Sequence, residues 1–470
     1  MTESVDVVVL GSGVAGLSAA FEAARAGAVV VVLEAADRIG GASSMSGAAC
    51  CLVGTPEQEA LGIVDSVERA LDDWRTLGGP TADLVWAEKY LAASRVEVRD
   101  WVERELGVTW GAPMQPEGNS VPRWHLPSDF GVGIVEALRD RCLALGVALR
   151  LGTPATGLRV EDGRVVGVRT AAGELSAGSV VVATGGFVAN RELLHRHAPQ
   201  LDAVPRVLLG GSPTALGLGH ALLEQAGAAF ASMDHIWVYP NGTPDPSDPT
   251  GERGLGLRGT STELWFNLEG DRFFDERHRG GHSGTRALLA QPGQSAWCVF
   301  DAADIPNVLL IDNERYATPH GPVPEAMEEF WRESPFAVRA DDAAQLAERM
   351  GLDVARVTTA VDAFHAAIAD GLDADPLTGR PLAGVAPLGR EGFAAIRFFP
   401  LAQKNFGGVR TDLACRVLDV AAEPIPGLFA AGEVAGMAGG SLNGRSGLEG
   451  TMFGPSLYSG RLAGMSAVRP

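Results

Sequence analysis

The fold is decided by the stretch "DVVVLGSGVAGLSAAFEAARAGAVVVVLEAA", residues 6–36. It begins with an unbroken apolar run, as expected of a strand that is buried on both faces. Glycines then lead into an alanine-rich helix and a second apolar strand. In this spacing Gly11 makes a tight turn, Gly13 lets the backbone approach a pyrophosphate, and Gly16 allows close packing of helix on strand. Glu34 is placed to bind a ribose diol. The stretch therefore predicts a dinucleotide-binding strand–helix–strand unit in an α/β fold.

Three later segments favour FAD over a loosely held nicotinamide. "DRIGGASSMSGAA" (37–49) offers a second set of backbone amides and hydroxyls to a diphosphate. "SAGSVVVATGGF" (176–187) and "IPGLFAAGEVAG" (425–436) are further buried strands that run into glycines. A chain that returns to one nucleotide site from positions so far apart encloses an extended dinucleotide.

Composition sets the broad class. The length of 470 residues favours two domains, and the net charge of −20 argues against nucleic acid or an anionic membrane as the main partner. The five cysteines form no CxxC pair, which makes disulfides, zinc or iron–sulfur sites unexpected and fits a reducing compartment. The N-terminus lacks a basic n-region, and no apolar run is long enough to span a bilayer. We expect a cytoplasmic protein with no membrane span and no metal.

Motifs along the whole chain resemble one flavoprotein family. They are "GSGVAGLSAA", "GGASSMSG", "RWH", "TPATGLRVEDGRVVGV", "VVVATGGF", "NLEGDRFFDE", "NFGGVRTD" and "GLFAAGEVAG". The sequence is similar to the group that includes fumarate reductase and succinate dehydrogenase flavoproteins, L-aspartate oxidase, urocanate reductase and the 3-ketosteroid dehydrogenases. The resemblance implies FAD, held non-covalently because "GGASSMSG" contains no histidine. The expected FAD contacts are Gly11, Gly13, Val14, Ala15, Gly16, Glu34, Ala35, Arg38, Gly40, Gly41, Ala42, Ser43, Ser46, Gly47, Ala155, Thr184, Gly185, Gly186, Gly408, Gly432, Glu433, Gly450 and Thr451.

The resemblance also implies a split Rossmann-like domain with an inserted α+β capping domain. We expect FAD-binding parts at 1–238 and 400–470 and a capping, substrate-binding part at 239–399, with the substrate where the cap closes. In this middle part "TELWFNLEGDRFFDE" predicts a hairpin around Gly270, and residues 322–336 and 341–372 read as helices.

The glycine-rich run "GGSLNGRSGLEGTMFGP" (439–455) precedes a last helix that we expect to begin near Pro455. The resemblance places this run over the flavin, where side chains would collide with the ring. Helix amides would then point at the ring and stabilise its negative charge when reduced. Its two charges, Arg445 and Glu449, face the substrate or each other.

Chemistry beside a carbonyl needs a group that transfers the proton and polar groups that stabilise enolate charge, while the flavin carries the hydride. In the fumarate reductases an arginine soon after the "NxxGxRFxxE" motif donates the proton. Its counterpart here is Gly280, so the neighbouring Arg279 would take the role, with His278 or His282 nearby.

The other groups of a fumarate site are mostly replaced. Tyr239 and Lys404 stand where that family has its two histidines, and Arg258 matches a relay arginine whose acid partner is here Leu255. Arg445 is close to the late carboxylate-binding arginine. These changes argue against fumarate as the substrate.

Three further residues can be explained by a structural role instead of a functional one. His125 matches a family position near the substrate but is equally compatible with a structural histidine, whereas Cys50 and Cys51 read best as small buried apolar residues.

We therefore predict an FAD-dependent oxidoreductase that acts on a carbon–carbon bond next to a carbonyl or carboxyl group. The alternatives are a 3-ketosteroid-type dehydrogenase, supported by "GTMFGPSLYSG", an amine or amino-acid oxidase, and a flavin-binding regulatory module without enzymatic activity. The sequence shows no second nucleotide fingerprint, haem motif or iron–sulfur set. The expected partners are a small carbonyl-containing substrate and an external electron donor or acceptor.

Overall fold

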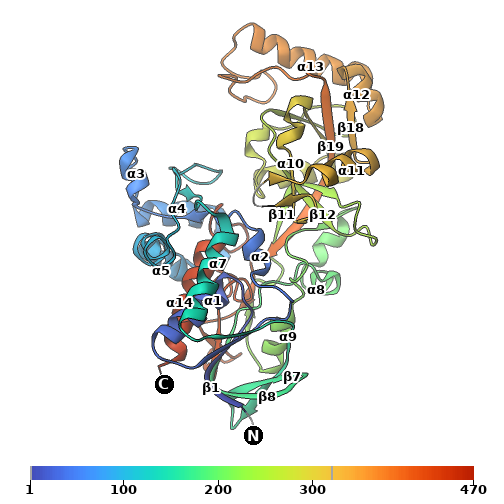
Figure 1. Ribbon diagram of the computed structural model, residues 1–470. Helices are drawn as coiled ribbons and strands as arrows, with labels where there is room; N and C mark the ends of the chain where they lie inside the picture. Colours follow the sequence, from blue (N-terminus) through green and yellow to red (C-terminus); the bar gives the residue numbers. More distant parts are fainter. Residues whose placement is uncertain (1–2, 319–320, 470) are drawn as a thin grey trace. The chain divides into compact units, whose positions relative to one another are not determined.

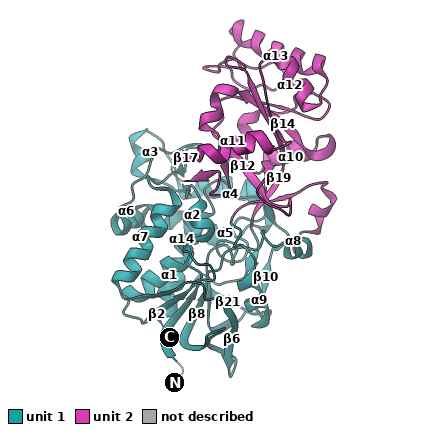
Figure 2. Cartoon of the chain, turned by 45° about the vertical axis from the view of Figure 1, so that its right-hand side comes forward, with its two compact units in different colours: residues 1–198, 212–237, 404–470 teal, residues 199–211, 238–403 magenta. Residues whose placement is uncertain are grey.

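The computed structural model describes residues 3–318 and 321–469. The chain forms two compact units, shown in different colours in Figure 2. Unit 1 comprises residues 1–198, 212–237 and 404–470, and unit 2 comprises residues 199–211 and 238–403. Each unit has its own sheet and its own core.

Unit 1 is built on a mainly parallel sheet in the order β21-β22-β8-β1-β2-β5. The first two strands and the helix between them form the expected unit, with β1 and β2 parallel from Val7↔Val30 to Leu10↔Leu33. β21 is antiparallel to β22, and the antiparallel β6–β7 hairpin joins the sheet through β8. The strands are β1 (Glu3–Leu10), β2 (Val30–Leu33), β5 (Ala148–Arg150), β6 (Ala155–Glu161), β7 (Arg164–Thr170), β8 (Gly173–Val182), β21 (Arg416–Leu418) and β22 (Pro424–Ala430). Two small sheets pair β3 (Cys50–Cys51) with β4 (Trp124–His125) and β10 (Phe230–Ala231) with β20 (Gly408–Val409).

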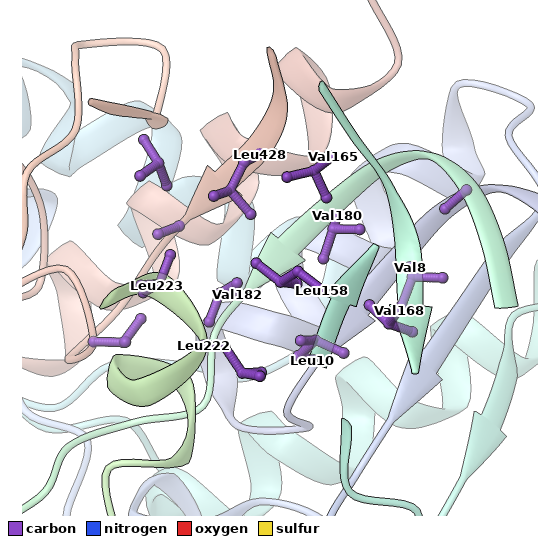
Figure 3. Packing of buried hydrophobic residues seen from close by; sticks show 14 of the residues in the cluster. Val8, Leu10, Leu158, Val165, Val168, Val180, Val182, Leu222, Leu223 and Leu428 are labelled. Atoms are coloured by element: carbon purple, nitrogen blue, oxygen red, sulfur yellow. The ribbon is translucent and has the colours of Figure 1, made fainter. Parts of the chain in front are cut away.

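The apolar core of unit 1 lies against one face of this sheet. Val8, Leu10 and Val182 point from the central strands toward side chains of the β6–β7 hairpin and of α9, and Figure 3 shows how they interlock. Alternate residues of the same strands are equally buried on the other face. This accounts for the unbroken apolar runs in β1, β2 and β8, since a parallel sheet is covered on both sides.

Helices of unit 1 include α7 and α14, which lie beside α1 (Figure 1). They are α1 (Val14–Arg25), α2 (Gly41–Met45), α3 (Pro56–Ala60), α4 (Val67–Gly78), α5 (Leu84–Ala93), α6 (Trp101–Leu106), α7 (Phe130–Ala144), α8 (Arg191–His197), α9 (Leu218–Gln225) and α14 (Phe453–Ala467). A π-helical turn, Ser94–Asp100, joins α5 to α6. The last helix thus begins two residues before the expected Pro455.

The contact between α1 and α14 depends on glycine. A Cβ atom added at Gly460 would overlap the carbonyl oxygen of Ala15, and one added at Gly464 would overlap that of Ala19. The two backbones therefore touch. Only glycine on α14 and alanine on α1 permit this approach, and the alanine-rich composition of α1 follows from it.

A buried charge cluster completes this contact. The Arg461 Nε of α14 donates to Glu22 Oε1 of α1 at 2.6 Å, and its Nη1 donates to the carbonyl and carboxylate of Glu97 at 2.6 and 2.8 Å. The guanidinium also stacks 4.4 Å from the centre of the Trp101 ring. Glu97 belongs to the π-helical turn, whose widened backbone leaves carbonyl groups in need of donors. Arg461 therefore joins three elements of unit 1.

Unit 2 contains a second sheet in the order β13-β14-β19-β11-β12-β15, with β9 and β18 also paired to β19. One face carries α12 and α13 and the other carries α11, each over its own apolar cluster. The strands are β9 (Leu208–Leu209), β11 (Ile236–Pro244), β12 (Gly254–Arg258), β13 (Glu263–Phe266), β14 (Ala296–Asp301), β15 (Leu309–Ile311), β18 (Ala337–Ala340) and β19 (Phe393–Asn405), besides the short pair β16 (Ala317–Thr318) and β17 (Gly321–Pro322). The helices are α10 (Ser283–Leu289), α11 (Pro324–Glu333), α12 (Ala343–Met350) and α13 (Val354–Ala369).

Two local predictions for unit 2 were only partly right. The expected hairpin has its first strand, β13, and its Gly270 turn, but the second arm makes a single bridge, Phe266↔Arg272, before the 3-10 turn Glu276–His278. The helical stretch 341–372 is two helices, since Gly351 ends α12 in the left-handed conformation at φ 69°.

His220 of α9 is a buried polar group in unit 1. It is 3% exposed, its ring lies against Phe187 and Phe230, and neither ring nitrogen has a hydrogen-bond partner among the described residues. Burial lowers its pKa to about 3, and nearby His197 adds to the shift. The ring is therefore neutral in the folded protein.

We expect Gly464→Ala to destabilise unit 1 by about 2–3 kcal/mol, because the new Cβ must push α14 away from α1. The change is read as a lower urea midpoint of unfolding in circular dichroism. Gly157→Ala is the matched control, since the nearest atom to its Cβ would be 3.6 Å away. Equal midpoints for the two variants would contradict the close contact.

We also expect His220→Phe to weaken the acid sensitivity of the protein. As pH falls below about 6.5 the unfolded chain takes up a proton that the folded His220 refuses, so wild-type stability falls by up to about 1.4 kcal/mol per pH unit from this group. Thermal unfolding between about pH 4 and pH 7 measures the slope. The same slope in wild type and variant would show that His220 is not responsible, and replacement of the exposed His278 by Gln serves as control.

Candidate functional site

The glycine-rich turn lies at the carboxyl end of β1. Gly11 has φ +99°, and a Cβ there would overlap the carbonyl of Ala183, so the turn rests directly on the segment after β8. A Cβ at Gly16 would overlap the carbonyl of Gly11. Gly13 differs, because its missing Cβ would meet only the Ser43 hydroxyl at 3.3 Å. The space beside Gly13, at the N-terminus of α1, is thus bounded by short polar groups.

Glu34 ends β2 beside this turn. Its Oε2 accepts from the Ser12 amide at 2.9 Å and from the Ser12 hydroxyl at 2.6 Å, while Oε1 accepts from the amide of Ala36 at 2.9 Å. A carboxylate offers about four acceptor positions, so these bonds orient the group and leave acceptor capacity for a diol.

The segment 40–47 forms a second set of polar groups next to α1. The Ser43 hydroxyl accepts from the amide of Val14 at 3.0 Å, and the Gly40 amide donates to the Ser12 hydroxyl at 3.3 Å. Gly40 has φ +100°, and a Cβ there would overlap Ser44. The first turn of α1 and this segment are therefore held side by side, as two loops around a diphosphate require.

Asn405 ties three segments together and was not foreseen from the sequence. Its Oδ1 accepts from the Phe187 amide at 3.1 Å, its Nδ2 donates to the carbonyls of Gly407 and Glu433 at 2.7 and 3.1 Å, and its amide donates to Glu433 Oε1 at 3.1 Å. A Cβ at Gly186 would overlap both Asn405 and Glu433. The segments around 186, 405 and 433 thus meet at one place.

Glu433 is half-buried at this junction. Burial raises the pKa of its carboxyl to about 7, against the opposing effects of the Asn405 amide and of Lys404. Its neighbour Gly432 has φ +73°, and a Cβ there would lie 2.8 Å from that of Ala15 in α1. The strand end of β22 therefore rests on the first turn of α1.

The remaining expected FAD contacts have varied surroundings. Ala35, Arg38, Ala42 and Gly47 are exposed, and Gly41 and Ser46 are half-buried. A Cβ at Gly408 would overlap the Gly436 amide, and one at Gly450 would lie 2.7 Å from that of Cys51. Thr451 donates its hydroxyl to the Leu448 carbonyl at 2.6 Å, and Ala155 begins β6 beside the core.

The groups at this edge fit an FAD molecule. Gly13 at the N-cap supplies no side chain to occupy the first amides of α1, and Glu34 is oriented beside them. Thr184 adds a buried hydroxyl oxygen that has no hydrogen-bond partner among the described residues, next to Gly185 at φ +74°. An orphan hydroxyl at a nucleotide-binding edge is the kind of group that a ligand satisfies.

Arg279 of unit 2 is held by a buried acid. Its Nη1 lies 2.8 Å from Glu263 Oε2 and donates to the Thr260 hydroxyl at 3.0 Å. The guanidinium is 31% exposed, whereas the carboxylate is 5% exposed. Glu263 raises the pKa of Arg279, which therefore stays protonated. One side of this cation is anchored, and about a third of the side chain is accessible to solvent.

Glu263 was also missed by the sequence analysis, which found only Leu255 where the family has an acid. Its carboxylate accepts further bonds from Thr260 at 2.8 Å, Cys298 at 3.2 Å and Trp265 Nε1 at 3.3 Å. It stands at the start of β13 in "TELWF", a strand in which an acidic residue reads as solvent-facing. No signal in the sequence marks it as buried beside Arg279.

Tyr239 and Arg258 pair on neighbouring strands of unit 2. The Arg258 guanidinium lies 5.5 Å from the centre of the Tyr239 ring, which is itself buried. Pro240, next to Tyr239, and the backbone of Arg279 both lie 2.9 Å from the Cβ that Gly284 lacks. The structure thus brings Tyr239, Arg258 and Arg279 into one region of unit 2.

His278 does not join this group closely. Its ring is half exposed and its Nδ1 lies 3.6 Å from Asp275 Oδ2. The motif residues Arg272 and Glu276 are internal supports, since Arg272 donates to Asp375 at 2.6 Å and Glu276 accepts from the Trp265 amide at 2.9 Å.

Lys404 and Arg445 belong to unit 1. Lys404 is half-buried beside Asn405, and its charge acts on Glu433. Arg445 is exposed, and the Cβ that Gly79 lacks would lie 2.9 Å from its Nε. No carboxylate lies within ion-pair distance of Arg445 in the described part of the chain, so it does not pair with Glu449.

His125 and the cysteine pair have structural surroundings. Both ring nitrogens of His125 are bonded, to the Arg123 carbonyl at 2.7 Å and to the Thr55 hydroxyl at 2.9 Å. Cys50 and Cys51 are buried in β3, and burial raises the pKa of the Cys51 thiol to about 12. Such thiols are unreactive.

The fold and its glycine-rich edge define an α/β protein that binds a dinucleotide. The chain belongs to the FAD-binding domain family, whose model matches residues 6–451. It is 31% identical to a KsdD-like steroid dehydrogenase of Mycobacterium tuberculosis, over 99% of this chain and 96% of the relative.

Two solved structures share the fold over the whole chain. The open conformation of a flavocytochrome c3 fumarate reductase has a TM-score of 0.75 and 28% identity, covering 99% of this chain and 78% of the other. The 3-ketosteroid-Δ4-(5α)-dehydrogenase of Rhodococcus jostii RHA1, in complex with 4-androstene-3,17-dione, has a TM-score of 0.72 and 28% identity, covering 100% and 97%. These findings confirm the expected family, the α/β fold, the FAD cofactor and the class of FAD-dependent oxidoreductases. In the described residues no helix is both long and apolar enough to cross a membrane.

We expect Glu34→Gln to weaken FAD binding about 10- to 100-fold, as loss of a charged hydrogen-bond acceptor does. Titration of apoprotein with FAD, followed by flavin fluorescence, gives the dissociation constant. Asp37→Asn removes the same charge three residues away and should leave the constant unchanged. An unaltered constant in Glu34→Gln would remove Glu34 from the site.

Proposed function

We propose that this protein moves a hydride between FAD and a carbon–carbon bond next to a carbonyl or carboxyl group of a small molecule. The bound flavin supplies the hydride chemistry at N5. The chain must then bind the carbonyl, stabilise enolate charge and handle one proton. Unit 2, which we propose to be the capping domain, supplies these groups.

The observation that carries the proposal is the ion pair between Arg279 and Glu263. A cation whose charge is needed only in the transition state must be rigid and must stay protonated. Both conditions are met, because Glu263 and Thr260 fix the guanidinium and Glu263 raises its pKa. We assign Arg279 to stabilisation of the developing enolate oxygen, and its open side is available for substrate.

The proton requires a second group. Tyr239 carries a hydroxyl in the same region of unit 2, and its ring is contacted by Arg258. We propose Tyr239 as the candidate that exchanges the proton with the substrate carbon next to the one that exchanges hydride. Arg258 then orients the ring and does not serve as a relay, since Leu255 offers no acid.

The residue replacements favour a ketone over a dicarboxylate as the substrate. Tyr239 and Lys404 replace the two histidines of a fumarate site, and Arg445 is the unpaired cation of the glycine-rich run. A steroid-type or other cyclic enone is therefore our leading substrate class, in keeping with the steroid dehydrogenases among the relatives. An unsaturated monocarboxylic acid is the second, favoured by Lys404 and Arg445 as carboxylate partners.

We further propose a reducing, cytoplasmic environment and FAD held without a covalent bond. All five cysteines are buried free thiols. No histidine occurs in the segment 40–47 beside α1. The electron donor or acceptor is a separate molecule, for which oxygen, a quinone, a free flavin and another protein are the candidate classes.

The purified holoprotein should exchange electrons with one of these substrate classes. The assay mixes it without oxygen with cyclic enones, unsaturated monocarboxylic acids or their saturated counterparts, and with an artificial electron donor or acceptor. The absorbance of the flavin reports its redox state. If FAD is bound and no compound changes that state, the proposed reaction is wrong.

With an active substrate, Arg279→Gln should lower kcat about 10²- to 10³-fold, as loss of a charge-stabilising donor does, while FAD stays bound. Arg277→Gln is the matched control, because Arg277 is exposed and pairs only with neighbouring Asp275 at 2.5 Å. Glu263→Gln should lower kcat less than Arg279→Gln. Normal turnover in Arg279→Gln would refute its assignment.

A further inference from the structure

Two arginines of unit 2, Arg206 and Arg397, share one phenylalanine and have no acidic partner among the described residues. Arg397 and Phe399 alternate along β19 with Ile396 and Phe398, which belong to the α11-side core, so they point to the opposite face of the sheet. β9 runs parallel to the end of β19, with Leu208 opposite Leu401. Arg206, two residues before Leu208, is thereby placed beside Phe399.

The distances define a compact cluster. The guanidinium carbon of Arg206 lies 5.1 Å from the centre of the Phe399 ring, and that of Arg397 lies 5.2 Å from the same centre. Phe336 packs edge-on against Phe399 at 5.4 Å, and Arg206 lies 5.2 Å from its centre as well. We call these four residues the arginine–phenylalanine cluster.

The charges of this cluster are not compensated within the described chain. No carboxylate of the described residues forms an ion pair with Arg206 or Arg397. Most other arginines of unit 2 do have acidic partners, namely Arg272, Arg277, Arg279, Arg315, Arg332, Arg339, Arg356, Arg380 and Arg390. In a chain with a net charge of −20, Arg206 and Arg397 are thus two cations beside one phenylalanine ring without an ion-pair partner among the described residues.

Most of their hydrogen-bond donors are also unused. Arg397 donates from Nη2 to the buried Ser295 hydroxyl at 3.0 Å, and Arg206 donates from Nη2 to the Gly251 carbonyl at 3.4 Å. The Nε of Arg397 is buried without a partner. Each guanidinium has five N–H donors, so both retain capacity for a bidentate contact.

Burial and the neighbouring Arg206 both lower the pKa of Arg397. An anion placed beside both cations would relieve their repulsion and would satisfy the free donors. A phosphate suits this better than a single carboxylate, because it carries up to two charges and enough oxygens to meet two guanidinium groups.

We propose that Arg206 and Arg397 form a binding site for a phosphate group, either free phosphate or the phosphate of a larger ligand. Phe336 and Phe399 hold the two cations in place and supply an apolar surface beside the anion. The site is built from residues of unit 2 alone and does not depend on the reaction proposed above.

The test uses the holoprotein, so that the phosphate-binding amides of α1 are occupied by FAD. Calorimetric titrations with inorganic phosphate, phenyl phosphate and succinate are run at constant ionic strength and about pH 8, where phosphate groups are dianions. We expect saturable binding of one phosphate or phenyl phosphate per chain. Binding of phenyl phosphate alone would identify the natural ligand as a phosphate on a larger molecule.

Arg206→Gln should weaken this binding about 10- to 100-fold, with Arg206→Lys weakened less because it keeps the charge. Arg332→Gln is the matched control, since it removes one exposed arginine paired with Glu333 at 3.1 Å. Arg206 is only partly buried, so its variants should fold even if Arg397→Gln does not. The proposal fails if neither phosphate binds, if succinate binds as tightly, or if Arg332→Gln weakens binding as much as Arg206→Gln.

Discussion

The backbone contact between α1 and α14 is the constraint on which unit 1 depends. Gly460 and Gly464 let the last helix rest on the carbonyls of Ala15 and Ala19, and Arg461 secures it through Glu22 and Glu97. Because α1 presents its N-terminus to the dinucleotide, its position sets that of Gly13 and of the strand end at Gly432. A buried ion pair adds little net stability, but it fixes one arrangement of the elements that share it.

In unit 2, too, an ion pair fixes the position of an important side chain. Arg279 is held by Glu263, an acid in a different place from the one that the family pattern suggests. Tyr239 and Lys404 stand where histidines would bind a dicarboxylate. Under the proposed function, Arg279 is the rigid cation for enolate charge, and the replaced histidines mark a different mode of substrate binding. Function in such a family is decided by a few side chains on a common fold.

Local patterns in the sequence were sufficient for the parts of the fold that depend on local geometry. The roles of Gly11 and Gly16 follow from their spacing, and the return of segments near 40, 185 and 432 to one edge follows from strands ending in glycine. The second arm of the Gly270 hairpin is reduced to one bridge, Phe266↔Arg272, and β13 pairs instead with β14, a partner that a local pattern cannot reveal. Glu263 and Asn405 escaped notice for a related reason. Their importance lies in contacts with residues far along the chain, and the local sequences "TELWF" and "KNFGG" do not predict those contacts.

The pairing of β22 with β8 has a consequence for the synthesis of the protein. The central sheet and the cover of α1 are completed by residues 404–470, which follow unit 2 in the sequence. During synthesis β1 and α1 are therefore made before unit 2, whereas β22 and α14 are made after it. Until β22 and α14 have been made, the chain lacks both the Gly432–Glu433 segment and the helix that packs on α1, so the dinucleotide-binding edge is incomplete.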